Sequence, residues 1–138
     1  MLSLDTSTII NCLRNGSSLT RTRFGEARAS GAPLVISGLV LYELCYGAAI
    51  SARPALHRER YEALVGDLPV EPFDAADALA AAQVRRMLHE VGRPIGAVDM
   101  LIAGQALARG WSVVTADVQD FGRIDGLKIV DWSAEAAT

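Results

Sequence analysis

Short apolar runs alternate along this chain with longer segments of helical length, and this alternation constrains the fold more than any other feature. The apolar runs of strand length stand at residues 1–4, 34–36, near 70, 111–115 and 127–130. Helical periodicity or capping residues mark the segments 6–14, 18–29, 38–48, 54–67, 75–91, 99–109 and 117–121. Strands that alternate with helices build parallel sheets covered on both faces. The sequence therefore predicts a three-layer α/β/α domain with a central parallel sheet.

Glycine and capping residues predict where the helices begin and end. Ser37 is a good N-cap, Asn15-Gly16 and Gly92 end the first and the longest helix, and Gly110 is a C-cap. The longest helix, capped by Asp74, carries its apolar residues at Ala76, Leu79, Ala80, Val84, Met87, Leu88 and Val91. The segment 99–109 is apolar nearly all round, so we expect it to be buried against the sheet. Without repeats or linkers, residues 1–138 are predicted to form a single domain with a loosely ordered tail at 133–138.

Composition excludes several classes of protein. Thirteen Lys and Arg against sixteen Asp and Glu give a net charge of −3, so any contact with nucleic acid must be local. Cys12 and Cys45 match no metal or redox spacing and are expected to be buried, reduced thiols. The most apolar stretch, 33–50, is too short for a membrane span and contains Glu43. Residues 1–5 read as a strand rather than a signal peptide, so we expect a cytoplasmic protein.

Four carboxylates are candidate site residues, because open parallel sheets bind their ligands at the carboxyl ends of the strands. Asp5 ends the first strand, Glu43 lies in an apolar helix, Asp99 begins the most apolar helix, and Asp117 follows the 111–115 strand. Like charges packed together raise one another's pKa values and need protons or a cation to neutralise them. Oxygen ligands without paired His or Cys suit Mg²⁺ or Mn²⁺.

Helix capping is the alternative interpretation of three of these acids. Asp5, Asp99 and Asp117 precede or begin helices, where aspartate is a common N-cap. Asp120, three residues after Asp117, could form an arrangement like a capping box with it. Glu43 is in mid-helix, beyond capping reach, although a solvated helix edge would also suit it. Residue positions alone leave a metal site and a set of caps open.

Four short motifs in a fixed order carry a family resemblance. They are Leu4-Asp5-Thr6-Ser7; Ile36-Ser37 with Tyr42-Glu43-Leu44 and Tyr46-Gly47; Gly92-Arg93-Pro94-Ile95-Gly96-Ala97-Val98-Asp99-Met100-Leu101-Ile102-Ala103; and Val114-Thr115-Ala116-Asp117 with Phe121 and Gly126-Leu127. Together they resemble the PIN-domain ribonucleases of the VapC toxin type, over residues 2–132.

This resemblance implies a fold, a reaction and a site. The metal-binding acids of the family carry over to Asp5, Glu43, Asp99 and Asp117, and its supporting hydroxyl to Thr115. Thr6 matches as well, whereas Ser7 stands where the family often has Asn. The implied activity is a Mg²⁺- or Mn²⁺-dependent endoribonuclease, the toxin of a type II toxin-antitoxin pair, in which two cations orient a water for attack on a phosphodiester. The implied products carry a 5′-phosphate and a 3′-hydroxyl.

Partners follow from the same resemblance. We expect an RNA substrate, a homodimer, and an antitoxin whose basic C-terminal tail places an Arg among the carboxylates. The tail would cross apolar helices that carry Leu13, Phe24, Leu39, Tyr42 and Tyr46. Candidate phosphate contacts are Arg14, Arg21, Arg23 and Arg28, for which a solvated helix face is the alternative.

Two other functions remain open. The first is an idle PIN-like module that regulates DNA through a bound partner. The second is a dehalogenase- or receiver-like phosphoryl-transfer domain with Asp5 as acceptor, weakened by Ser7 where a second Asp is needed and by Lys128 being the only lysine. His57 and His89 are placed on polar helix faces without a catalytic role.

Overall fold

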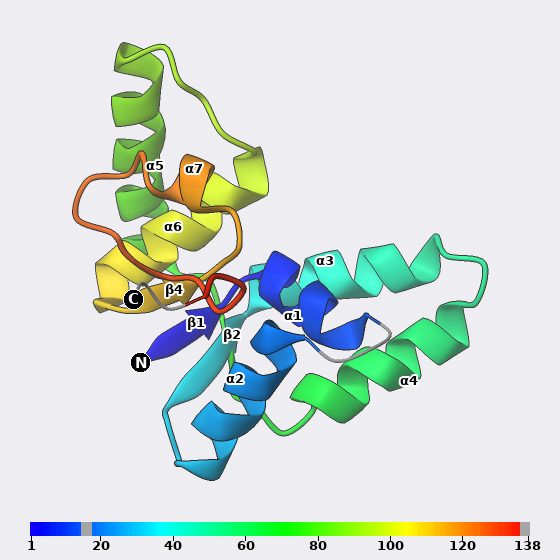
Figure 1. The fold of residues 1–138 in the computed structure, drawn as a ribbon. Helices are drawn as coiled ribbons and strands as arrows, with labels where there is room; N and C mark the ends of the chain where they lie inside the picture. Colours follow the sequence, from blue (N-terminus) through cyan, green and yellow to red (C-terminus); the bar gives the residue numbers. More distant parts are fainter. Residues whose placement is uncertain (15–17, 136–138) are drawn as a thin grey trace.

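A parallel sheet forms the centre of the computed structural model, which describes residues 1–14 and 18–135 (Figure 1). Its strands are β1 (Leu2–Leu4), β2 (Leu34–Ser37), β3 (Val70–Glu71), β4 (Ser112–Val114) and β5 (Lys128–Val130). Their order is β3-β2-β1-β4-β5, and every pairing is parallel. The predicted parallel sheet is confirmed. Because β1 lies between β2 and β4, the segments that follow these three strands emerge side by side.

The helices follow the predicted segments closely. They are α1 (Thr6–Leu13), α2 (Leu19–Ala29), α3 (Gly38–Ala49), α4 (Pro54–Val65), α5 (Ala75–Glu90), α6 (Ala97–Arg109) and α7 (Val118–Phe121). Ser37 caps α3 by accepting a hydrogen bond from the backbone N–H of Leu39. Gly110 ends α6 in the left-handed conformation with φ 69°, which glycine adopts without strain. The predicted stop at Asn15-Gly16 lies outside the described residues.

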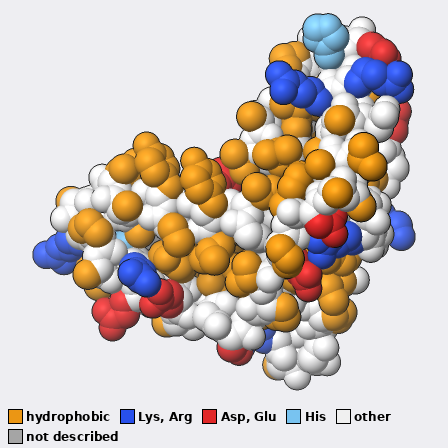
Figure 2. All heavy atoms as spheres, turned by 180° about the vertical axis from the view of Figure 1, so that it is seen from behind, with side chains coloured by type: hydrophobic (Ala, Val, Ile, Leu, Met, Phe, Trp, Pro, Cys, Tyr) orange, Lys and Arg blue, Asp and Glu red, His pale blue; other side chains and the backbone are white. Residues whose placement is uncertain are grey.

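Helices cover both faces of the sheet, which makes the three predicted layers. In Figure 1, α5 and α6 lie together on one side, and α1, α2 and α4 lie on the other. The α3 and α4 helices pack against each other as a projecting pair. Figure 2 shows this pair and α5 as two diverging arms, with hydrophobic side chains along the hollow between them and an acidic side chain at its base. No helix within the described ranges is both long and apolar enough to cross a membrane.

The buried face of α5 differs from the predicted one. Asp77, Ala81, Val84 and Leu88 face the interior, whereas Leu79 is 73% exposed and Val91 is also exposed. The cause is the close packing of α6, which contacts α5 more extensively than it contacts the sheet. A Cβ atom at Gly104 of α6 would lie 2.4 Å from the Cα atom of Ala81. The 97–109 helix is therefore buried mainly against α5, and only a narrow stripe of α5 fits there.

An ion-pair network that the sequence analysis missed closes the lower end of the α5–α6 pair. Arg109 Nη2 lies 2.8 Å from Asp77 Oδ2, and Arg109 Nη1 lies 2.9 Å from Glu71 Oε2. Asp77 is completely buried. Burial alone would raise the pKa of Asp77, but hydrogen bonds from Arg109 and from the backbone of Asp74 lower it below its ordinary value. Asp77 also completes a reciprocal capping box with Asp74.

Two further expectations concern cysteines and the end of the chain. Cys12 is a buried free thiol as expected, but the prediction for Cys45 is wrong, because Cys45 is exposed, with its Sγ 3.2 Å from the Tyr61 hydroxyl. The tail was predicted to be loosely ordered from residue 133. Its described part, 133–135, contacts the body of the protein where Arg23 donates a 2.6 Å hydrogen bond to the Ala134 carbonyl.

Candidate functional site

The four predicted carboxylates gather at the carboxyl edge of the sheet, where β2, β1 and β4 end. Asp5 directly follows β1, Asp117 lies just beyond β4, and Glu43 projects from α3, which begins where β2 ends. Asp99 joins them from the first turn of α6. Each of the other three acids contributes to the electrostatic environment of Asp99. The adjacency of the three strands therefore brings together acids from distant parts of the sequence.

Asp5 is the most enclosed of these acids, with 4% of its surface exposed. Its carboxylate accepts hydrogen bonds from the Thr6 backbone N–H at 2.8 Å, the Ser7 hydroxyl at 3.1 Å and the Thr115 hydroxyl at 2.8 Å. Burial raises the pKa of Asp5 above its ordinary value, the three hydrogen bonds oppose that rise, and the charge of Asp117 adds to it. The carboxylate is thus fixed in one orientation on three donors.

The hydroxyls of Thr6, Ser7 and Thr115 tie the cluster together. Thr6 Oγ1 donates a 2.6 Å hydrogen bond to Glu43 Oε1, while the Thr6 backbone holds Asp5. Thr115 Oγ1 accepts from the Asp117 backbone N–H at 3.0 Å and donates to Asp5. Ser7 Oγ accepts from the Ala116 backbone N–H at 3.4 Å. Each of the three supporting residues named from the sequence therefore links two groups around the site by hydrogen bonds.

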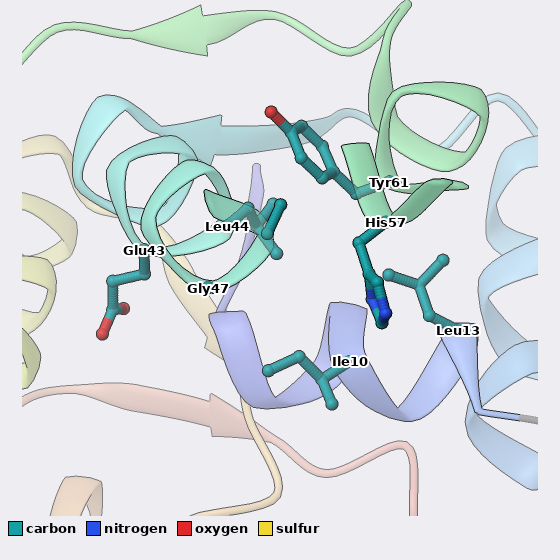
Figure 3. A pocket seen from close by; sticks show the side chains of 8 residues that line it. Ile10, Leu13, Glu43, Leu44, Gly47, His57 and Tyr61 are labelled. Carbon is teal, nitrogen blue, oxygen red and sulfur yellow. The ribbon is translucent and has the colours of Figure 1, made fainter. Parts of the chain in front are cut away.

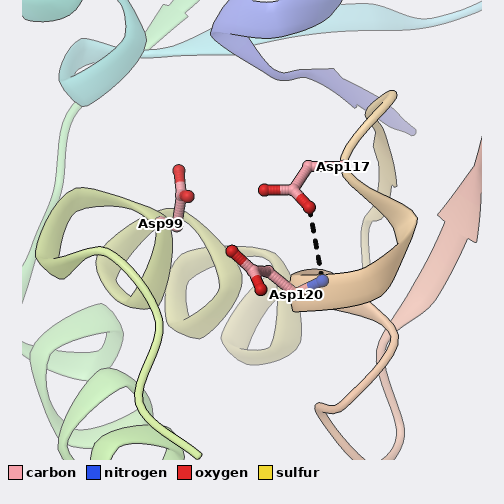
Figure 4. Close-up of side chains that lie close together, drawn as sticks. All are labelled: Asp99, Asp117 and Asp120. Atoms are coloured by element: carbon pink, nitrogen blue, oxygen red, sulfur yellow. Dashed lines mark hydrogen bonds between the residues drawn. The ribbon is translucent and has the colours of Figure 1, made fainter.

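Asp99, Asp117 and Asp120 form the tightest group of acids (Figure 4). One carboxylate oxygen of each lies within 4.8 Å of one from each of the others. Burial and the negative charges of Asp5, Glu43, Asp117 and Asp120 raise the pKa of Asp99 to about 6. A carboxylate in this environment is stabilised when a cation or a proton joins it.

Asp120 is the acid that the sequence analysis placed only in helix capping. Its backbone N–H does donate to Asp117 Oδ1 at 3.3 Å, which confirms Asp117 as the N-cap of α7 (Figure 4). The Asp120 carboxylate nevertheless belongs to the three-acid group and also lies 3.4 Å from Arg123 Nη1. The spacing of three residues between Asp117 and Asp120 was the available signal, because such residues are neighbours on one helix face.

The capping alternative holds for two of the predicted acids and fails for a third. Asp5 and Asp117 do cap α1 and α7. Asp99 caps nothing, because the N-cap of α6 is Gly96, and the carboxylate of Asp99 sits within the first turn. A carboxylate has two oxygens and several lone pairs, so one cap hydrogen bond leaves capacity for another ligand. Capping and cation binding are therefore compatible at Asp5 and Asp117.

The donor set of this cluster fits a hard divalent cation. The closely grouped ligand atoms that the described residues supply are carboxylate oxygens, from Asp99, Asp117 and Asp120. Oxygen donors with concentrated negative charge suit Mg²⁺ and Mn²⁺, whereas Zn²⁺ favours nitrogen and sulfur. Asp5 and Glu43 lie at the edge of this group, oriented by the threonine and serine hydroxyls.

Three of the four arginines named as phosphate contacts, Arg21, Arg23 and Arg28, bind groups within the protein. Arg21 donates to the Cys12 carbonyl at 2.9 Å and to the Arg14 carbonyl, and Arg14 itself is exposed beside the end of α1. Arg23 donates to the carbonyls of Asp131 and Ala134. Arg28 pairs with Asp67. These guanidinium groups hold α1, α4 and the C-terminal segment in place.

A cavity of about 260 Å³ lies beside Glu43, between α1, α3 and α4 (Figure 3). Aliphatic side chains from α1 and α3 line it, and His57 and Tyr61 close it from α4. His57 was predicted on a polar helix face, and it is exposed, but its ring also borders this cavity. Of the apolar residues predicted to flank the acids, Leu13 lines the cavity, whereas Phe24 is buried in the core against Trp132.

Comparison with known protein sequences identifies the family of this chain. The chain matches the PIN domain family over residues 2–127. It is 37% identical over 130 residues to the tRNA(fMet)-specific endonuclease VapC of Shigella flexneri, an alignment that covers 94% of this chain and 96% of the relative. The Salmonella typhimurium protein of the same name is 36% identical over 129 residues and is covered to the same extent.

Solved structures give the same result in three dimensions. The crystal structure of DNA-bound VapBC from Salmonella typhimurium matches with a TM-score of 0.86 and 36% identity, covering 95% of this chain and 97% of that one. The structure of VapBC2 from Rickettsia felis bound to a promoter DNA fragment matches with a TM-score of 0.87 and 25% identity, covering 95% and 98% of the two chains. Sequence and fold agree, and the chain belongs to the PIN-domain family, among its VapC ribonucleases.

Proposed function

We propose that this protein is a divalent-cation-dependent endoribonuclease and the toxin of a type II toxin-antitoxin pair. The observation that carries the proposal is the convergence of Asp5, Glu43, Asp99, Asp117 and Asp120 at one edge of the sheet, with the pKa of Asp99 raised to about 6. Relatives named as ribonucleases and endonucleases support the choice of RNA as substrate. Family membership in turn favours a nuclease over the phosphoryl-transfer alternative.

The residues divide into two roles in this proposal. Asp99, Asp117 and Asp120, with Asp5 and Glu43 directly or through water, would hold Mg²⁺ or Mn²⁺. The cation would lower the pKa of a water and stabilise negative charge at the phosphodiester. Thr6, Ser7 and Thr115 are positioning residues, because their hydroxyls fix the carboxylates of Asp5 and Glu43 before the cation binds. Asp120 extends the ligand set that the family resemblance carries over to this chain.

The partner is proposed from the same cluster. Relatives have been solved as VapBC complexes, and we propose that an antitoxin with a basic C-terminal tail binds this chain in the cytoplasm. An Arg of that tail would form charge-assisted hydrogen bonds among carboxylates that lack a cation. The tail and the cation would therefore compete, and each would weaken the binding of the other by the same factor. We also propose that the chain works as a single domain in a homodimer.

Cleavage of RNA by the purified protein tests the proposed function. The wild-type protein should cut RNA with Mn²⁺ or Mg²⁺ and stop in EDTA. Asp99→Asn should lose cleavage while keeping its fold, because it keeps the shape of the side chain and removes a ligand charge. Asp125→Asn, which changes an exposed acid outside the cluster, is the matched control and should remain active. A folded wild-type protein that binds the antitoxin but cuts no RNA with either cation would instead support the idle, DNA-regulating module.

We also propose that arginines near the site contact the phosphates of the RNA. Because Arg23 and Arg28 already contact carbonyls or Asp67, their removal should lower stability as well as RNA affinity. Arg14, whose side chain is exposed at the end of α1, is the better probe of a phosphate contact. Arg14→Ala should reduce RNA affinity and the slope of its salt dependence without lowering the melting temperature.

A further inference from the structure

Two exposed aromatic rings lie on α3, the helix that carries Glu43. Tyr42 and Tyr46 are one helical turn apart, and 59% and 58% of their surfaces are exposed. Their ring planes differ by 14°, and the ring centroids are 6.5 Å apart. Rings of this size are usually packed against other groups when they lie on a half-buried helix. Neither ring belongs to the hydrophobic core.

The two exposed rings are nearly parallel, which is the orientation needed to stack on both faces of a planar ligand. Carbon atoms in van der Waals contact are about 3.5 to 4.0 Å apart, so one ring sandwiched between two others needs roughly 7 Å between the outer planes. The two tyrosine rings are stacked on each other, with their centroids 6.5 Å apart. An aromatic base would therefore enter between them after rotation of one side chain, and would take over the stacking contact of the ring that moves.

The position of the pair relative to Glu43 indicates which planar ligand it would meet. Residues on an α-helix are separated by about 100° of rotation, so Tyr42 and Tyr46 form a row roughly 60 to 100° to one side of Glu43. Gly47 and Leu44 lie to the other side and border the cavity of Figure 3. The Glu43 carboxylate is held by Thr6 at the acid cluster. A nucleotide whose phosphate reaches the cluster would thus carry its base close to the tyrosines.

The charge of the protein adds a second reason to expect stacking. The chain has a net charge of −3, and the candidate site is itself acidic. Attraction of phosphates to Lys and Arg normally supplies much of the affinity for nucleic acid, but in this chain the Arg21, Arg23 and Arg28 side chains already bind carbonyls or Asp67. Stacking of bases on aromatic side chains is independent of charge and tolerant of sequence. RNA recognition in particular relies on unstacked bases that lie against Tyr, Phe or Trp.

We propose that Tyr42 and Tyr46 form a slot for one unstacked nucleobase of the RNA substrate, next to the scissile phosphate. This inference rests on the proposed ribonuclease function and names a substrate-binding subsite for it. The aromatic faces supply the binding, so phenylalanine can replace either tyrosine, whereas an aliphatic side chain of similar size cannot. A protein surface on the same helix would behave differently, because it would bury leucine as readily as tyrosine.

Fluorescence of a stacked base tests the slot directly. The probe is a short oligouridylate with one 2-aminopurine, titrated with protein in Mg²⁺ on an Asp99→Asn background that prevents cleavage. Binding should quench the 2-aminopurine, and Tyr42→Leu or Tyr46→Leu should weaken binding roughly fivefold to a hundredfold. Tyr42→Phe and Tyr46→Phe should retain the quenching and the affinity. Ile50→Ala, which shortens another exposed apolar side chain next to α3, is the control and should bind as its background does.

Several outcomes would overturn the slot. Equal affinity of the leucine and phenylalanine variants would exclude stacking, as would the absence of quenching. If the leucine variants kept their RNA affinity but changed their oligomeric state in sedimentation, the rings would instead form a contact between copies of the chain. The proposed function fails separately, if the wild-type protein cuts no RNA while the probe is still quenched. If the wild type cuts RNA and the leucine variants bind and cut it equally well, only the slot is wrong.

Discussion

Replacing Asp99 by asparagine should stabilise the cation-free protein at neutral pH. Burial and neighbouring carboxylates raise the pKa of Asp99 from 3.8 to about 6. The folded protein therefore holds this proton more tightly than the unfolded chain does. The resulting contribution to stability is fully present below about pH 4 and is lost as the pH rises through about 6. Asparagine resembles the neutral acid at every pH, so the variant escapes this loss.

The magnitude follows from the pKa and from the exposure of the group. A rise from 3.8 to about 6 is worth about 3 kcal/mol at 1.36 kcal/mol per pH unit. Because Asp99 is half-buried, screening by solvent reduces this to on the order of 1 kcal/mol. For a chain of this length, 1 kcal/mol raises the melting temperature by about 4 °C. Burial also raises the pKa of Asp5, so some pH dependence of the same sign remains in the variant.

Thermal melts in EDTA at about pH 5 and about pH 7.5 measure this change in melting temperature. Asp77 does not titrate in this range, because its pKa is lowered below its ordinary value. The wild type should melt at a higher temperature at the lower pH, and Asp99→Asn should narrow the difference. Asp125→Asn, at an exposed acid, should behave as the wild type does. Added Mn²⁺ should raise the melting temperature of the wild type more than that of Asp99→Asn. A lower melting temperature of Asp99→Asn than of the wild type at neutral pH in EDTA would refute the reasoning.

Three other substitutions test the packing around the site by their effect on the free energy of unfolding in urea. Gly104→Ala should lower it by about 1 to 3 kcal/mol, because the added methyl would lie 2.4 Å from a backbone atom of α5; an unchanged value would mean that the two helices separate easily. Gly47→Ala should raise it by about 0.5 to 1 kcal/mol, since its Cβ meets nothing within 4 Å, and a decrease would contradict the open space at this wall of the cavity. Arg109→Met should lower it by about 3 kcal/mol or more by leaving Asp77 buried without its partner. Arg58→Met, at an exposed ion pair, is the control and should leave it nearly unchanged.

Local sequence patterns predicted the strands and helices because the signals for them are local. Ser37 and Gly110 mark helix ends through hydrogen bonds and backbone angles that involve only near neighbours. The gathering of Asp5, Glu43 and Asp117 also followed from the sequence, since the carboxyl ends of parallel strands share one edge. The strand order, which places β1 between β2 and β4, is what brings them together.

The features that the sequence did not predict depend on contacts between distant elements. Leu79 fits the apolar periodicity of α5, yet it is exposed because α6 covers a different and narrower stripe. Asp77 resembles an ordinary helix-start acid, and only the fold brings Arg109 to it. Asp120 has the spacing of a capping residue. Its carboxylate also lies close to that of Asp99, because the fold brings α7 near the start of α6. Each case needs the tertiary arrangement as well as the local pattern.

The chemistry of the RNA ends left by the purified protein tests the central claim most directly. In the proposed reaction, a water activated at the acid cluster would attack the phosphodiester without using the ribose 2′-hydroxyl. Cleavage with Mn²⁺ should therefore leave a 5′-phosphate and a 3′-hydroxyl, should stop in EDTA, and should be lost in Asp99→Asn. Products that end in a 2′,3′-cyclic phosphate, or cleavage that continues in EDTA, would contradict a cation-dependent nuclease built on these carboxylates.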